Sequence, residues 1–196
     1  MDIRAWVRVW DPVVRFGHWL LVSAVVIAWF TRHVGGSWHE IVGYVSLAVV
    51  GGRLLWGAVG SRHARFRDFL ETPRDTLGYA RQVWHRREPR HLGHNPLGGY
   101  MVVALVVTVI VVGASGWLYT TDRFWGIAWV EALHLWSTYT LFGLAALHVA
   151  GVLYASFRHR ENLVAAMIHG RKRGGNDVPG DQPAAAGRFG DEAPRV

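Results

Sequence analysis

Four long apolar runs divide this chain. They cover residues 13–31, 41–59, 97–119 and 130–157, and formally charged side chains interrupt them at only three positions: Arg15, Arg53 and Glu131. A helix of about 20 mainly apolar residues crosses the roughly 30 Å hydrocarbon core of a bilayer. The pattern therefore predicts an all-α protein, built as a four-helix transmembrane bundle.

The segments outside these runs predict one further helix and a tail. Residues 73–87 follow Thr72 and begin with Pro73, a combination that favours a helix start. One face of this helix is apolar and arginines lie opposite it; the apolar residues are Leu77, Ala80, Val83 and Trp84. The helix either lies on the inner membrane surface or packs under the bundle. Residues 171–196 are rich in glycine, proline and charge, which predicts a disordered tail after one membrane domain over residues 1–170.

The net charge of +7 is distributed unevenly. Seventeen lysines and arginines lie before the first run, between the second and third, or after the fourth, whereas the two short loops hold one each, Arg32 and Arg123. Basic residues concentrate on the cytoplasmic side of membrane proteins. We therefore expect the N- and C-termini to be cytoplasmic. The basic residues then reflect membrane topology, so we expect the protein to contact membrane lipid and not nucleic acid.

The sequence contains no cysteine. This excludes iron–sulfur clusters held by thiolates, covalently attached c-type haem, zinc–thiolate sites and disulfides. A bound metal must therefore be held by histidine, carboxylate or backbone groups.

Histidines occur at matched depths in the predicted spans. His134 and His148 are 14 residues apart, which places them on one helix face about 21 Å apart along the axis. The predicted topology puts His18 at the inner depth of His148 and His39 at the outer depth of His134. The competing candidates are His33 for the outer pair, and His91 and His94 for the inner pair.

Paired imidazoles on facing helices can hold haem iron from both sides, and two such pairs make an electron path across the bilayer. A histidine within a span can also serve only as a hydrogen-bonding group. Arg53 lies 14 residues after His39, at the inner depth. It would contact a haem propionate or a quinone, or extend to the inner headgroups.

Several segments carry a resemblance to a known family, and they cover about residues 10–172. The chain resembles the bacterial di-haem membrane cytochromes b of the Ni/Fe-hydrogenase cytochrome b subunit type, and is similar to the formate dehydrogenase gamma subunit. The matching segments are Trp10–Trp19, Gly43–Gly57, Ala64–Phe69, Leu92–Gly98, Leu147–Gly151 and Glu161–Met167.

The resemblance implies two non-covalent haems b in the bacterial inner membrane. His18 and His148 would be the axial ligands of the inner haem, and His39 and His134 those of the outer haem. Asn95 matches an asparagine that lines a quinone site in the gamma subunits, although Gly99 stands where the family pattern has glutamine.

The implied function is transmembrane electron transfer. It would link a periplasmic redox partner, either a c-type cytochrome or a dehydrogenase or hydrogenase, with the quinone pool or another carrier, as an electron-transfer subunit rather than a stand-alone enzyme. The alternative is an autonomous quinone-linked oxidoreductase that acts on a small periplasmic reductant such as superoxide.

Overall fold

The computed structural model describes residues 6–34 and 37–174, and four long helices dominate it. These are α1 (Pro12–Thr31), α2 (Trp38–Val59), α4 (Pro96–Tyr119) and α5 (Ala128–Arg158). All four are long and apolar enough to cross a membrane. Their bounds lie within three residues of the predicted spans, so the predicted four-helix bundle is confirmed.

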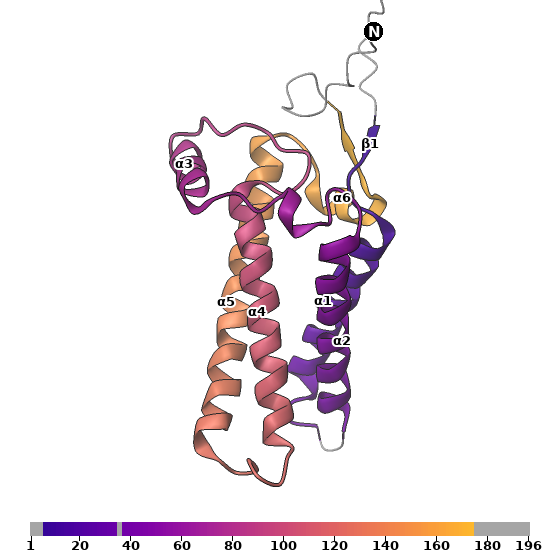
Figure 1. Ribbon diagram of the computed structural model, residues 1–196, viewed down its shortest axis with the longest axis vertical. Coiled ribbons are helices and arrows are strands. Elements are labelled where there is room, and N and C mark those ends of the chain that lie inside the picture. The colour runs from indigo at the N-terminus through magenta and orange to yellow at the C-terminus, as the bar shows by residue number, and fades with distance from the viewer. Residues whose placement is uncertain (1–5, 35–36, 175–196) are drawn as a thin grey trace, which may run out of the picture.

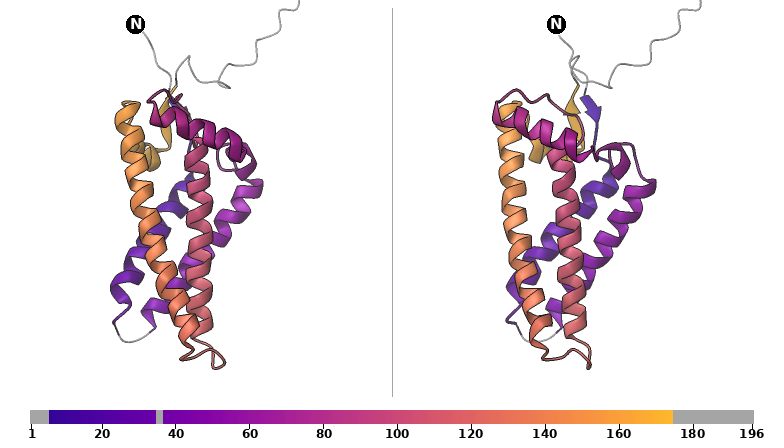
Figure 2. Two further views of the ribbon diagram at one scale, coloured as in Figure 1. Left: turned by 90° about the vertical axis from the view of Figure 1, so that its left-hand side faces the viewer. Right: turned by 60° about the vertical axis from the view of Figure 1, so that its left-hand side comes forward.

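The bundle consists of two helical hairpins that lie side by side (Figures 1 and 2). Helix α1 packs against α2, α4 packs against α5, and α2 joins the hairpins through α4. The contact centres on four buried apolar residues: Val50, Val106, Val109 and Leu141. Most other helix side chains are half-buried or exposed, as apolar lipid-facing residues of a membrane bundle should be.

The shorter elements gather at one end of the bundle, called here the basic end (Figure 1). They are β1 (Trp6–Arg8), the 3₁₀ turn η1 (Phe66–Asp68), α3 (Pro73–Trp84), α6 (Leu163–His169) and β2 (Arg171–Arg173). By the charge distribution this is the predicted cytoplasmic end. The four spans alternate in direction, so the chain enters the first and leaves the last at this same end.

The first residues of the predicted tail form part of the fold. Strand β2 pairs antiparallel with β1, placing Val7 opposite Lys172. Gly170 has a left-handed backbone (φ 81°), a conformation that glycine adopts without steric cost. Its carbonyl accepts hydrogen bonds from the Val9 and Trp10 amides. Residues 171–173 therefore form a strand despite their charged composition. The predicted tail from residue 175 lies outside the described residues.

Helix α3 starts as predicted and ends earlier. Thr72 caps it by accepting a hydrogen bond from the Asp75 amide, and the helix stops at Trp84 rather than at residue 87. Buried Tyr79 lies on the side that meets α4, whereas Leu77 and Trp84 of the predicted apolar face are exposed. The helix therefore does not pack under the bundle through its predicted apolar face, since two residues of that face are exposed.

Asp11 fixes the start of α1 to the end of α2. Its carboxylate caps α1 through the Val14 amide at 2.9 Å and accepts hydrogen bonds from Trp56 Nε1 and Ser61 Oγ. Burial raises the pKa of this carboxyl, but the hydrogen bonds from Ser61, Val14 and Trp56 outweigh burial and bring the pKa below its ordinary value. The ionised form therefore stabilises the fold.

We expect Asp11→Ala to lower the free energy of unfolding by roughly 2 kcal/mol, because a helix cap and two side-chain hydrogen bonds are lost. Asp11→Asn keeps the cap and should cost less. Because the folded pKa is depressed, the wild-type advantage over Asp11→Asn is present above pH 3.8 and is lost as the pH falls through the folded pKa. Thermal unfolding in detergent at several pH values measures both effects, and an unchanged midpoint in Asp11→Ala would contradict them.

Candidate functional site

Two of the predicted histidines face each other across the bundle. His39 lies in the first turn of α2 and His134 in the second turn of α5. Their ring centroids are 6.1 Å apart and the ring planes are nearly perpendicular, at 82°. His33, the competing candidate, is exposed after the end of α1. The structure thus brings His39, and not His33, together with His134.

Both rings of this outer pair are oriented by backbone carbonyls. His39 Nδ1 donates to the Ala28 carbonyl at 2.9 Å, and His134 Nδ1 donates to the Val112 carbonyl at 3.0 Å. Ser115 Oγ lies 3.3 Å from the same His134 nitrogen. A proton held on Nδ1 leaves the Nε2 lone pair free, which is the arrangement that metal-ligating histidines use.

The spacing of the outer pair suits a metal between the rings. A first-row metal bonded at about 2 Å to one nitrogen of each imidazole separates the two ring centroids by about 6 Å. The measured 6.1 Å agrees. Within the described part of the chain no three histidine, cysteine or acidic side chains cluster to chelate an ion. The donor set therefore fits a haem iron, which needs only two axial ligands from the protein.

His18 of α1 and His148 of α5 form the inner pair at the level nearer the basic end. The two imidazoles are close enough to influence each other electrostatically. His18 Nδ1 is buried and has no hydrogen-bond partner in the structure, and the ring meets Trp19 edge-on at 5.1 Å. Among the described residues no backbone carbonyl accepts a hydrogen bond from either ring, so the tautomers of this pair are not fixed as those of the outer pair are.

Glycines beside the histidines leave the helix backbone accessible. A Cβ added at Gly43, Gly143 or Gly151 would meet no atom within 4 Å, and one at Gly17 would meet only a Val49 methyl at 3.9 Å. A flat macrocycle can approach a backbone that carries no side chain. The backbone near His18, His39 and His148 is therefore open to such a group.

An apolar layer separates the two histidine pairs. Trp29 of α1 meets Phe142 of α5 with ring centroids 4.7 Å apart, and Leu141 belongs to the central buried cluster. Both α5 residues lie between His134 and His148 in sequence. The four histidines therefore lie as two pairs at two depths rather than as a single cluster.

Arg53 lies in the inner half of α2. Its guanidinium stacks over the Phe66 ring at 4.7 Å, and its Nη1 atom is buried without a hydrogen-bond partner. No carboxylate of the described residues forms an ion pair with it. A buried guanidinium in this state is suited to receive an anionic group.

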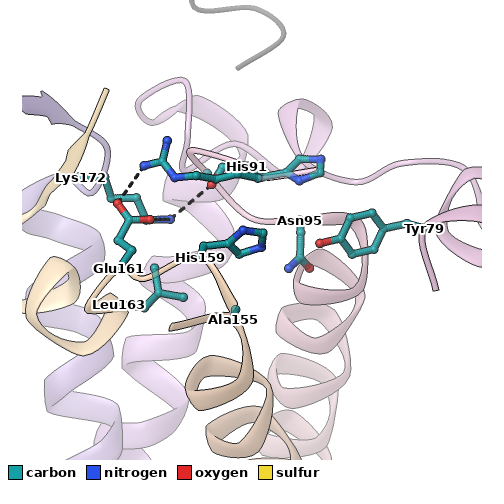
Figure 3. Close-up of a pocket in the computed structure, with 10 residues that line it drawn as sticks. Tyr79, His91, Asn95, Ala155, His159, Glu161, Leu163 and Lys172 are labelled. Carbon is teal, nitrogen blue, oxygen red and sulfur yellow. Dashed lines mark hydrogen bonds and ion pairs between the residues drawn. The ribbon is translucent and has the colours of Figure 1, made fainter. Parts of the chain in front are cut away.

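Asn95 has a local structural role. Its Oδ1 caps α4 by accepting a hydrogen bond from the Gly98 amide at 2.7 Å. The residue also lines a pocket at the basic end, together with Tyr79 and His159 (Figure 3). The pocket volume is about 50 Å³, enough for water but smaller than a quinone ring. The structure thus gives Asn95 a helix-capping role, and its side chain also forms a hydrogen bond with Tyr79.

Charged side chains that the sequence did not single out close this pocket. Glu161 pairs with Arg90 at 2.9 Å and with Lys172 at 3.9 Å (Figure 3). Burial lowers the pKa of Lys172 to about 8, with Glu161 acting in the opposite direction. Burial also raises the pKa of Tyr79 to about 12. The Glu161 ion pairs tie β2 and the segment between α5 and α6 to the loop before α4.

Comparison with known proteins places the chain in a family. The sequence profile of prokaryotic cytochrome b561 matches residues 9–170. A probable Ni/Fe-hydrogenase B-type cytochrome subunit of Azotobacter vinelandii is 23% identical, and one of Azotobacter chroococcum mcd 1 is 22% identical; each alignment covers 88% of this chain and 91% of the relative. No solved structure matches the chain. With its four spanning helices, this chain is a member of the prokaryotic cytochrome b561 family, a multi-pass protein of the bacterial inner membrane that binds b-type haem and transfers electrons across it.

Proposed function

We propose that the chain conducts electrons between the two membrane faces through two haems b. His18 and His148 are the axial ligands of the inner haem, and His39 and His134 those of the outer haem. The observation that carries this proposal is the outer pair, with rings 6.1 Å apart and both Nδ1 atoms bonded to carbonyl oxygens. The inner pair is supported by the buried, unpartnered Nδ1 of His18.

The haems supply one-electron redox chemistry when bound. Two histidines of this chain would hold each iron, a pairing suited to electron transfer rather than to the binding of oxygen or a substrate. The residues of this chain would hold each iron, orient the ligand rings and exclude water with the apolar layer around Leu141. Two irons held in this way favour a function in electron transfer rather than catalysis on a small-molecule substrate.

The proposed electron partners lie on opposite sides. The relatives are described as cytochrome subunits of Ni/Fe-hydrogenases, and by analogy a hydrogenase, another dehydrogenase or a c-type cytochrome would exchange electrons with the outer haem. The inner haem would exchange with the quinone pool or another carrier. In this arrangement the basic end, with both termini, faces the cytoplasm.

The alternative function, oxidation or reduction of superoxide at the outer face, receives less support. An anionic substrate is drawn by an excess of positive charge. The exposed charged residues at this end, among those the structure describes, are mixed in sign: Arg32, Glu40, Asp122, Arg123 and Glu131. Arg32 also stacks on Trp29 at 3.7 Å. No cationic patch is present among these described residues.

The stoichiometry and the partner can be tested on the purified chain. We expect two extractable haems b per chain and a split α-band in the reduced-minus-oxidised spectrum. A single haem would contradict the two-site assignment. Reduction by added quinol, measured at the same bands, tests the quinone link. A chain that stays oxidised with quinol, yet is reduced by a co-purifying dehydrogenase or cytochrome, would exclude quinol as the donor.

A further inference from the structure

The buried side-chain nitrogens that have no hydrogen-bond partner among the described residues include two at the basic end that lie near each other. They are Nη1 of Arg53, from α2, and Nδ1 of His94, from the loop just before α4. His94 is near enough to interact electrostatically with both Arg53 and His148. Two different elements therefore deliver unused donors to the neighbourhood of one proposed haem ligand. Buried polar groups in proteins are nearly always hydrogen-bonded, so such a pair requires an explanation.

A row of aromatic rings holds these two groups in place. The Arg53 guanidinium carbon lies 4.7 Å from the centroid of the Phe66 ring, and the centroids of the Phe66 and Phe69 rings are 5.7 Å apart. Phe69 then meets the His94 ring with centroids 4.6 Å apart, and Trp10 meets the same histidine ring with centroids 4.7 Å apart. The His94 ring thus packs against two aromatic side chains. The two donors belong to one packed unit rather than to separate mobile side chains.

The charges around this unit leave one position for an anion. Asp11 is near Arg53, but its carboxylate already accepts hydrogen bonds from Val14, Trp56 and Ser61. The buried carboxylate of Glu88 pairs with Arg158 at 3.1 Å, and Glu161 pairs with Arg90 and Lys172. Among the residues that the structure describes, none therefore supplies the carboxylate that a desolvated guanidinium needs.

His94 complements Arg53 as a neutral donor. Burial, followed by the charges of Arg53 and Lys172, lowers the pKa of His94 to about 3. The imidazole is therefore uncharged near neutral pH and carries one N–H. A guanidinium and a neutral N–H donor together match the two oxygens of a single carboxylate.

We propose that Arg53 and His94 together bind one propionate of the inner haem, Arg53 through its charge and His94 through an Nδ1–H hydrogen bond. The proposal rests on the two-haem function stated above and adds His94 as a second binding residue. The shared chemistry, an anionic oxygen group, could also come from a lipid phosphate at the inner membrane surface. We commit to the propionate because His148, a proposed ligand of that haem, lies near His94.

The proposal predicts a specific redox effect. A cation near a haem favours the reduced form, since reduction lowers the positive charge at the iron. Arg53→Gln should therefore shift the equilibrium of the inner haem about tenfold toward the oxidised form, a midpoint potential about 59 mV lower for a one-electron couple. His94→Phe, which retains an aromatic ring between Trp10 and Phe69 without the N–H, should shift it about threefold in the same direction.

Two matched variants separate the hydrogen bond from packing. His94→Asn restores an N–H near the position of Nδ1 and should recover most of the potential. His85→Phe replaces an exposed histidine at the end of α3 and should change nothing. The outer haem serves as the internal reference, because a folded variant must keep its spectrum and potential. His94→Phe could lose the inner haem altogether. In that case, an inner haem that is restored in His94→Asn supports the proposal, and an inner haem that is absent from both variants overturns the proposal.

Infrared difference spectroscopy of the full chain identifies the anion. Haem carrying ¹³C in its propionates marks the carboxylate bands, and we expect Arg53→Gln and His94→Phe to move those marked bands. Unmoved bands together with an unchanged potential would overturn the proposal, and so would movement confined to lipid phosphate bands. If the wild-type chain binds no inner haem, the two-haem function itself fails, a result distinct from failure of the propionate contact.

Discussion

We expect His134→Ala to abolish the outer haem and spare the inner haem, and His148→Ala to do the reverse. This follows from the proposal that the single helix α5 carries one ligand for each haem, with the two histidines separated by the layer that contains Leu141 and the Trp29–Phe142 contact. With alanine at position 134 only His39 would remain to hold the outer haem, so we expect that haem to be lost during purification. Each variant should retain about one of two haems, measured by haem extraction and by the α-band that remains.

His33→Ala provides the control for this pair of variants. His33 is exposed beyond the end of α1, whereas His39 faces His134, so both haems should remain in His33→Ala. Electron paramagnetic resonance of the oxidised chain adds a ligand-sensitive signal, because each bis-histidine centre contributes its own low-spin feature. Two intact haems in either alanine variant of α5 would refute the assignment.

Gly116→Val should also remove or displace the outer haem, although it touches no proposed ligand bond. A Cβ at position 116 would lie 3.1 Å from His134 Cε1 and 3.3 Å from its Nδ1. The branched side chain of valine is larger still, so it would push the imidazole away from the Val112 carbonyl, which now accepts its hydrogen bond at 3.0 Å. The ring would lose the orientation that this hydrogen bond gives it.

We expect Gly116→Val to reduce outer-haem content at least several-fold while inner-haem content stays near wild type. The intensities of the two α-bands in the reduced-minus-oxidised spectrum measure the content of each haem. Val107→Leu gives a matched control because it adds volume at an exposed position of the same helix. Gly116→Ala should give an intermediate result with a shifted outer-haem potential. Normal content and potential of the outer haem in Gly116→Val would show that α4 does not orient His134.

Hydrophobic pattern was sufficient to predict the four spans because lipid imposes a single strong constraint, internal hydrogen bonding over a fixed thickness. It was insufficient at the basic end. There the chain is neither uniformly apolar nor in contact with lipid throughout, and tertiary pairing decides the outcome. Arg171–Arg173 form a strand because β1 is available beside them, and Tyr79, outside the predicted apolar face of α3, is the residue of that helix that is buried.

The candidate site was predictable to the level of its histidines. Helix depth paired His39 with His134, but depth alone did not separate His39 from His33, which required the positions of the rings. The orienting groups could not be found from sequence. The carbonyls of Ala28 and Val112 belong to every residue type, and Ser115 carries no distinguishing pattern. The haem assignments themselves remain proposals that the variants above test.

The apolar layer between the two histidine pairs has an electrical consequence. Its members carry no titratable side chain: Leu21, Val25, Val50, Val102, Leu105, Val106, Val109, Ile110, Val112 and Leu141. Under the two-haem proposal, an electron crossing this layer moves alone, without a compensating proton. The 14-residue interval corresponds to about 21 Å of a roughly 30 Å core, so at 100 mV each crossing works with or against about 1.6 kcal/mol of membrane potential. The bundle would therefore be electrogenic, and the membrane potential would bias the direction in which it conducts.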